Sequence, residues 1–138
     1  MSHINRLKVL RVLEASDTSL YEIIPEGVLF PKNADDVKNI IIAAVNTGVT
    51  VHPRGTGTST AGQSLGNGIV LDFSKYMKNI VAVGNDYVDV EPGLILGKLN
   101  SYLEKRNVFI PVDPSSAAMC SVGGMVSNNA SGIHSFLY

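Results

Sequence analysis

The stretch PRGTGTSTAGQ (residues 53–63), here called the glycine loop, concentrates glycines and small hydroxyl residues in one place. Glycine is favoured where the chain turns with positive φ or where a ligand lies close against the main chain. Successive backbone N–H groups in such a turn form a nest for an anion, and hydroxyls add further donors. The glycine loop therefore predicts a phosphate cradle, with an ordinary flexible loop as the alternative. Its glycines are Gly55, Gly57 and Gly62, and its hydroxyl residues are Thr56, Thr58, Ser59 and Thr60.

A strand–helix–strand unit is expected immediately before the glycine loop. EGVLFP (26–31) favours a short strand, and NADDVKNIIIAAVNTG (33–48) favours a helix that begins after the capping residue Asn33 and ends before Gly48. VTVHP (49–53) predicts a second strand, parallel to the first. The apolar stripe that we expect to face the core comprises Val37, Ile41, Ala44 and Val45.

The segments after the glycine loop add further strands and a helix. LGNGIVLDFS (65–74) predicts a turn and a strand, and NIVAVGNDYVDVEPG (79–93) predicts a hairpin around Gly84-Asn85-Asp86. LILGKLNSYLEKRN (94–107) predicts an amphipathic helix that ends in basic residues, where a cation is favourable. This order of elements indicates a mixed α+β fold.

An N-terminal helical segment, residues 1–20, is expected to stand apart from this unit. Within it, residues 4–15 predict a short helix with Leu7, Leu10 and Leu13 facing inward. Charged residues interrupt the apolar ones throughout this stretch, which is not the pattern of a signal peptide.

Two well-known phosphate-binding motifs do not describe the glycine loop. Gln63 stands where a P-loop has its phosphate-binding lysine, and Thr60 stands where a dinucleotide fingerprint has its third glycine. Both motifs also place a helix directly after the loop, so that the helix N-terminus holds the phosphate. Here a turn and a strand are expected instead, so both motifs fail on two counts.

A second segment, residues 113–132, repeats the chemistry of the glycine loop. It is rich in glycine, serine and asparagine, and Asp113 is the only formally charged residue from Asn107 to the end of the chain. Two small, polar segments that are poor in carboxylates suggest one extended ligand with an anionic middle, such as a cofactor bridged by a diphosphate. The alternative is that SVGGMVSNNASG (121–132) is a tightly packed helix contact.

The composition narrows the class of protein. The 138 residues suffice for about one domain, and 45% hydrophobic with 17% charged residues indicate a packed globular body. The net charge is −1 and the sequence has no basic run, whereas nucleic-acid binding normally shows a basic patch. The single cysteine, Cys120, cannot form an internal disulfide, which is typical of a reducing compartment. We expect a cytoplasmic protein with no transmembrane segment and no metal site.

Taken together, PRGTGTSTAG, GIVLDFS, VEPG, IPVDPSS and SVGGMVSNNASG resemble the FAD-binding domain of the PCMH type. This domain defines the vanillyl-alcohol oxidase superfamily, and the pattern is most similar to the glycolate oxidase and D-lactate dehydrogenase group. The resemblance runs from about residue 21 to the end, so residues 21–138 would form an incomplete domain of this type. It implies the first subdomain, with the strand–helix–strand unit and the hairpin, and the beginning of the second.

The resemblance also implies which residues contact FAD. Pro53 through Gly62 would wrap the diphosphate with backbone amides, and residues 113–116 and 121–124 would line the cofactor, with Asn129 and Gly132 close to it. The candidate cofactor-binding residues are Pro53, Arg54, Gly55, Thr56, Gly57, Thr58, Ser59, Gly62, Asp113, Pro114, Ser115, Ser121, Val122, Gly123, Gly124, Asn128, Asn129 and Gly132. Some branches of the superfamily tether FAD through a histidine where this chain has Thr58, so the resemblance implies a non-covalent cofactor.

The activity that the resemblance implies is oxidation of a 2-hydroxy acid, such as glycolate or D-lactate, by hydride transfer to FAD. The family's substrate-binding residues lie outside the matching stretch, so no catalytic residue is assigned. The alternative is a non-catalytic module that keeps the fold for packing or for binding a partner. We expect the isolated chain to purify without colour, to bind added FAD weakly, and to form a homo-oligomer through apolar surface.

Four single residues leave alternatives open. Arg54 either helps to neutralise a diphosphate or forms a salt bridge. His52 fits a packed histidine within a strand better than it fits a ligand or a base. His134 is assigned either a cofactor role or none, and Cys120 is expected to be inert because no nearby cation would lower its pKa.

Overall fold

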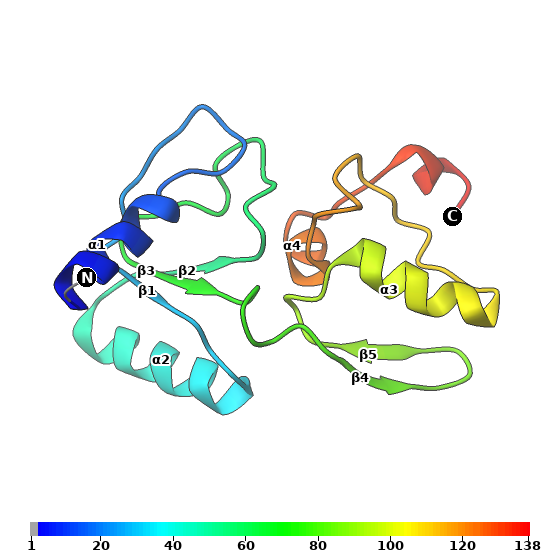
Figure 1. The fold of residues 1–138 in the computed structure, drawn as a ribbon, viewed down its shortest axis with the longest axis horizontal. Coiled ribbons are helices and arrows are strands. Elements are labelled where there is room, and N and C mark those ends of the chain that lie inside the picture. The colour runs from blue at the N-terminus through cyan, green and yellow to red at the C-terminus, as the bar shows by residue number, and fades with distance from the viewer. Residues whose placement is uncertain (1–2) are drawn as a thin grey trace.

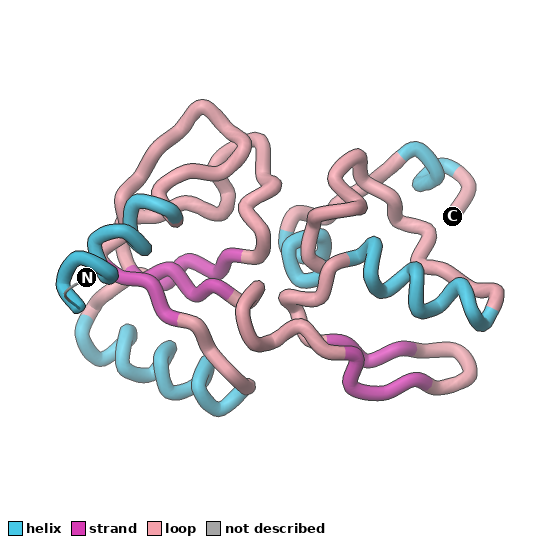
Figure 2. The backbone as a smooth tube through the Cα atoms, viewed as in Figure 1, coloured by secondary structure: helices cyan, strands magenta, loops and turns pink. Residues whose placement is uncertain are grey.

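The computed structural model describes residues 3–138, and it describes side chains from residue 7 onward. Two lobes of mixed helix and strand lie side by side in Figure 1, joined by the short connection at residues 73–79. The first lobe holds a parallel sheet and two helices, and the second holds a hairpin and two helices. Much of the chain between the elements is loop, as Figure 2 shows in pink. The α+β fold predicted from the sequence is confirmed.

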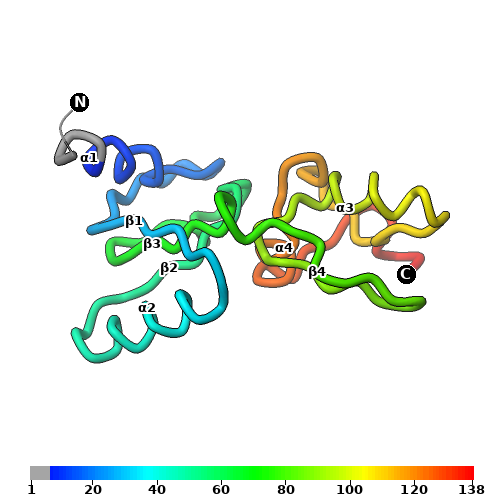
Figure 3. Tube along the Cα trace, turned by 60° about the horizontal axis from the view of Figure 1, so that its bottom comes forward, coloured from blue at the N-terminus to red at the C-terminus, as the bar shows by residue number. Residues whose placement is uncertain are grey.

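The sheet of the first lobe has three parallel strands in the order β1-β3-β2. β1 (Gly27–Leu29) and β2 (Val51–Arg54) are parallel, as predicted, but β3 (Ile69–Asp72) lies between them. β3 is the most buried strand, since α1 and α2 lie on opposite faces of the sheet (Figure 3). A strand covered on both faces has a continuous apolar run, as IVL in β3 does.

The helix α2 (Ala34–Thr47) begins and ends where the sequence predicts. The Oδ1 atom of Asn33 accepts a hydrogen bond from the Asp36 N–H at 2.8 Å, which satisfies one free donor of the first turn. Gly48 follows the last turn with φ of 71°, a left-handed conformation that glycine adopts at little cost. Both helix ends are therefore set by local sequence.

The predicted apolar stripe of α2 is only partly correct. Ala44 is buried and Val37 is half-buried, but Ile41 and Val45 are exposed, Val45 by 75%. The reason is length: fourteen helical residues span about 21 Å, whereas a strand of four residues spans about 13 Å. One helix of this length overhangs a sheet of such short strands, so part of its apolar face is left uncovered.

The N-terminal helix α1 (His3–Leu13) forms where it is expected, but its leucines do not all face inward. Leu10 is half-buried, whereas Leu7 and Leu13 are 50% and 63% exposed. Residues three apart are offset by about 60° around a helix, so the three leucines cover an arc of about 120°, and only the middle one, Leu10, is half-buried. The inward prediction is therefore wrong for Leu7 and Leu13.

The second lobe begins with the predicted hairpin, β4 (Ile80–Val83) and β5 (Val88–Val90). The predicted helix follows as α3 (Leu96–Leu103), and its last turn is a 3-10 turn, η1 (Glu104–Arg106). The apolar core of this lobe includes Leu94, Leu99 and Leu103, which pack against the hairpin.

The C-terminal part of the second lobe holds the short helix α4 (Val122–Ser127) and the 3-10 turn η2 (Ile133–Phe136). Cys120 and Met125 pack with Leu96 of α3 in a second buried cluster. None of the helices described, from residue 3 to residue 138, combines the length and the apolar character needed to cross a membrane.

Candidate cofactor site

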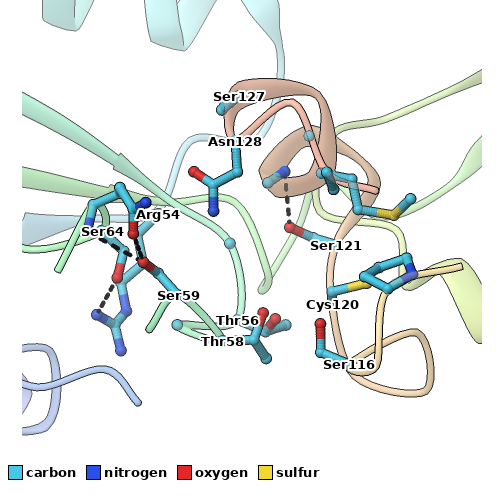
Figure 4. A pocket seen from close by; sticks show the side chains of 18 of the residues that line it. Arg54, Thr56, Thr58, Ser59, Ser64, Ser116, Cys120, Ser121, Ser127 and Asn128 are labelled. Carbon is cyan, nitrogen blue, oxygen red and sulfur yellow. Dashed lines mark hydrogen bonds between the residues drawn. The ribbon is translucent and has the colours of Figure 1, made fainter. Parts of the chain in front are cut away.

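A cavity of about 500 Å³ lies between the glycine loop of the first lobe and the second segment of the second lobe. β2 and β3 run in parallel toward the second lobe, so the chain that follows β2 leaves the sheet at the edge that faces this lobe (Figure 1). Figure 4 shows Ser59 of the glycine loop on one side of the cavity and Ser121 on the other. The two segments that the sequence singled out, about 60 residues apart, are therefore brought together.

Most of the predicted site residues line this cavity. They are Pro53, Arg54, Gly55, Thr56, Gly57, Thr58, Ser59, Pro114, Ser115, Ser121, Gly123, Gly124 and Asn128. Five others do not: Gly62, Asp113, Val122, Asn129 and Gly132. A side chain at Gly132 would run into Asp113, and Gly62 lies against Tyr21, so these two glycines permit close packing outside the cavity.

The cavity also exposes residues that were not among the candidate cofactor-binding residues, although Thr60 and Ser116 lie within stretches 53–62 and 113–116, which the resemblance assigns to the cofactor. These additional residues are Thr60, Gln63, Ser64, Phe73, Pro92, Ser116, Cys120, Met125, Ser127, Ala130 and Ser131. The hydroxyl residues among them continue the pattern of the two segments, and that pattern could have identified them. Phe73 and Pro92 carry no such signal, because only the fold brings the connection between the lobes and the start of the second lobe to this wall.

The backbone of the glycine loop turns through two left-handed glycines, Gly57 with φ of 69° and Gly62 with φ of 77°. Between them, the Ser59 hydroxyl oxygen accepts a hydrogen bond from the Gln63 N–H at 3.2 Å. No helix follows the loop, as predicted, and the chain next enters β3. The loop is thus an ordered turn that keeps small side chains at the cavity wall.

On the opposite wall, close packing fixes α4. The Ser121 hydroxyl accepts a hydrogen bond from the Gly124 N–H at 3.3 Å, which caps the helix. The Gly123 N–H donates to the Pro92 carbonyl at 2.8 Å, and a side chain at Gly123 would run into Pro92. The alternative interpretation of SVGGMVSNNASG (121–132) as a tightly packed contact therefore holds at Gly123, which packs against Pro92 and also lines the cavity.

The two walls come into close contact at Gly55. A side chain at this position would run into the hydroxyl of Ser121 on the opposite wall. Asn128 extends from the end of α4 toward the glycine loop (Figure 4). Glycine at position 55 therefore keeps the two walls close and leaves backbone exposed between them.

The charge distribution around the cavity suits an anion. Among the described residues that line it, none is an aspartate or a glutamate, and Arg54 is the one formally charged side chain. Arg54 is buried and forms an ion pair with Glu14, so the salt-bridge alternative is confirmed. Its guanidinium is turned toward the N-terminal segment (Figure 4), so an anion in the cavity would be held mainly by backbone amides and hydroxyls.

The remaining candidates lie at the edge of the site or outside it. His52 is a packed histidine, as expected: its ring covers Gly66, and its Nε2 atom lies 3.2 Å from the Thr50 hydroxyl. His134 lies outside the cavity wall, and its Nδ1 atom lies 2.6 Å from a carboxylate oxygen of Asp113. Hydrogen bonds from the His134 backbone and ring hold the pKa of Asp113 below its ordinary value. Within residues 3–138, no cluster of three His, Cys, Asp or Glu side chains is arranged to hold a metal ion.

These observations test whether the residues present fit a cofactor with a diphosphate. The cavity volume lies within the range that small-molecule sites have. At Gly55 and Gly57, the space that a β-carbon would need is already taken by Ser121 and Arg54, so only glycine leaves the backbone amides open there. The donors are amides and hydroxyls, and no lining carboxylate opposes a negative ligand. The residues fit the diphosphate part of FAD.

Comparisons with known proteins point the same way. The D-2-hydroxyglutarate dehydrogenase of Pantoea ananatis is 35% identical over 133 residues, which cover 93% of this chain and 13% of that protein. The glycolate oxidase subunit GlcD of Bacillus subtilis is 30% identical over 125 residues, which cover 88% of this chain and 26% of that protein. The chain thus spans a small part of the length of the curated relatives that it matches.

A solved structure shares the fold. That of an alkyldihydroxyacetonephosphate synthase superposes with a TM-score of 0.80 at 19% identity, covering 96% of this chain and 30% of that one. The sequence profile of the FAD binding domain family matches residues 25–138, which include both walls of the cavity. The chain therefore belongs to the FAD binding domain family.

Proposed function

We propose that the cavity between the two lobes binds the diphosphate of FAD without a covalent link. The observation that carries this proposal is the lining: glycine amides and hydroxyls converge from both lobes, and the described residues that line the cavity include no carboxylate. Such donors stabilise negative charge, whereas a carboxylate would repel it. Thr58, at the position of the tethering histidine in some branches, cannot form the histidyl bond.

The predicted site residues divide into two roles in this proposal. Those that line the cavity contact the cofactor. Gly62, Asp113, Val122, Asn129 and Gly132 support the loops instead, as Gly132 does by packing against Asp113. Residues 21–138 are the part of the chain that we assign to the FAD-binding unit, and residues 1–20 are an N-terminal helical segment.

We infer that the protein containing this domain is an FAD-dependent dehydrogenase of a small 2-hydroxy acid. Bound FAD would supply the acceptor for a hydride. The residues of this chain would bind and orient it and shield it from water. The relatives' names refer to D-2-hydroxyglutarate, glycolate and D-lactate, and each of these carries a hydroxyl beside a carboxylate. A cytoplasmic location is consistent with the single cysteine.

Self-association of the isolated chain is also part of the proposal. An apolar groove of about 390 Å³ lies in the second lobe between the hairpin, α3 and α4. Large apolar side chains, among them Val126 and Phe136, are exposed in the same lobe. Exposed apolar surface of this kind favours association. Light scattering should therefore report a species larger than a monomer.

Ligand discrimination tests the cofactor assignment. The purified chain is titrated with FAD, ADP and FMN, and binding is followed by flavin fluorescence and by calorimetry for ADP. FAD and ADP carry the diphosphate and FMN does not, so we expect FAD and ADP to compete and FMN to bind at least about tenfold more weakly. Equal binding of FMN and FAD would show that the cavity does not recognise the diphosphate, and no binding of any of the three would contradict the assignment.

A further inference from the structure

Residues between α1 and β1 contact the glycine loop through hydrogen bonds and an ion pair, and these contacts lie outside the cavity. Residues 14–18, here called the N-terminal brace, precede the part of the chain that the family profile matches. The Thr18 N–H and hydroxyl both donate to the Ser59 carbonyl, at 3.1 and 2.6 Å. Ser59 also lines the cavity, so the brace binds the carbonyl of a residue that belongs to the cavity wall.

A charged contact anchors the beginning of the loop. Glu14 pairs with Arg54, and their side chains are only 14% and 9% exposed. Arg54 also donates to the Ser16 carbonyl at 2.8 Å, so two positions of the brace hold its guanidinium. A buried guanidinium without its counter-ion is strongly unfavourable, so Glu14 fixes where Arg54 can lie.

Arg54 in turn supports the turn at Gly57. A side chain at Gly57 would run into the Arg54 guanidinium, so the left-handed turn lies directly against it. Arg54 also donates to the Ser64 hydroxyl at 3.3 Å, just beyond the end of the loop, and that hydroxyl donates to Asp17 of the brace at 3.1 Å. The loop is therefore held near its start, at its middle and at its end from one side.

We propose that Glu14 and Thr18 are positioning residues for the cofactor site. They touch no part of the cavity, and they act by holding Arg54 and Ser59 so that the glycine loop keeps the shape that receives the diphosphate. This inference rests on the proposed FAD-binding function. It adds that cofactor affinity depends on residues outside the matched family domain.

The test combines FAD affinity with backbone hydrogen exchange of residues 55–64 in the chain without ligand. Glu14→Gln removes the charge and keeps the size, Glu14→Asp keeps the charge, and Thr18→Val replaces the hydroxyl with a methyl group. Glu26→Gln is the matched control, because Glu26 lies in the same lobe with an exposed side chain and belongs neither to the brace nor to the cavity lining. Urea unfolding of each variant separates a local change from a loss of the whole fold.

We expect Glu14→Gln to raise the dissociation constant of FAD about tenfold and to speed exchange of the loop amides by a similar factor. Thr18→Val should raise it about threefold. Glu14→Asp should recover most of the loss, and Glu26→Gln should change neither quantity. In an Arg54→Met background, Glu14→Gln should have no further effect on affinity, because Glu14 acts through Arg54.

The outcomes separate this inference from the proposed function. If the unmodified chain binds FAD, and Glu14→Gln and Thr18→Val leave affinity and loop exchange unchanged, the inference is wrong and the proposed function stands. If loop exchange speeds up as expected but the unmodified chain does not bind FAD, the brace is real and the cofactor assignment is wrong. An effect of Glu14→Gln that persists in full without Arg54 would also overturn the inference.

Discussion

The two walls of the cavity carry similar residues but are held in place by different means. Side chains hold the glycine loop from behind, through the ion pair of Glu14 with Arg54 and the hydrogen bonds of Thr18. The second wall is held by its backbone, as the Val122 N–H donates to the Leu94 carbonyl at 2.8 Å, and by the burial of Cys120. The first wall is therefore sensitive to changes of charge and conformation, and the second to changes of volume.

The largest effect should come from a change in the conformation of the first wall. Gly57→Val puts a β-branched residue at a left-handed φ of 69° and against the Arg54 guanidinium, so we expect FAD affinity to fall at least about 100-fold. The measurement is flavin bound per mole of protein during an FAD titration. Gly48→Val is the control, because its φ of 71° carries the same backbone cost at a position with open space around it.

Gly48→Val should lower stability and leave FAD affinity unchanged. If the two glycine variants lost affinity equally, general loss of stability would explain both results, and the glycine loop would have no special role.

The second effect is a change of volume in the second wall. Gly123→Leu forces a side chain into Pro92, and such overpacking costs about 1–3 kcal/mol of folding free energy. We expect urea unfolding to show this loss and FAD affinity to fall about tenfold as α4 moves. Gly97→Ala in α3 is the control, because a methyl group there makes only ordinary contacts. Unchanged stability of Gly123→Leu would mean that close packing does not fix this wall.

The sequence predicted those structural features that neighbouring residues determine, and it failed for features that depend on distant parts of the chain. The ends of α2 follow from Asn33 and Gly48. The polar character of both cavity walls follows from the residues of the two segments themselves. The burial of apolar helix residues was not predictable in this way, since it depends on which element lies over each face. Val45 is exposed because the strands beneath α2 are short.

The ion-pair partner of Arg54 could not be predicted from the sequence either. The sequence left a salt bridge and a diphosphate contact open, and Glu14, forty positions earlier, is the partner that the fold selects. The same holds for Phe73 and Pro92, which reach the cavity only because of how the two lobes are joined. The polar character of the site could be predicted from the composition of its segments. Which residues contact each other could be known only from the fold.

A smaller effect concerns the pH dependence of the first wall. Burial raises the pKa of Glu14 above its ordinary 4.5, with the charge of Arg54 opposing and that of Asp72 adding to the rise. A carboxyl whose pKa is raised by folding stabilises the fold below its unfolded pKa and loses that contribution as pH rises through its folded pKa. As pH rises above 4.5, the free energy of unfolding of Glu14→Gln should therefore rise relative to that of the unmodified chain. Urea unfolding at several pH values measures this difference, and a relative fall would contradict it.

The smallest effect, of opposite sign, concerns Asp113, which lies in the second segment but outside the cavity lining. Hydrogen bonds from the His134 backbone and ring lower the pKa of Asp113 below 3.8. Its stabilising contribution is therefore present above this pH and is lost as pH falls through the lowered value. In His134→Ala, an NMR titration of the Asp113 carboxyl carbon should show a higher pKa than in the unmodified chain. An unchanged value would mean that the ring does not hydrogen bond to Asp113 in solution.

The central claim is that both walls contact one ligand through its diphosphate. Hydrogen exchange measured by mass spectrometry, with and without saturating FAD, tests this claim most directly. We predict slower exchange of the amides in both residues 54–64 and residues 120–128, and no change in the hairpin at residues 80–90. Protection of only one wall, or protection confined to the apolar groove of the second lobe, would contradict the claim.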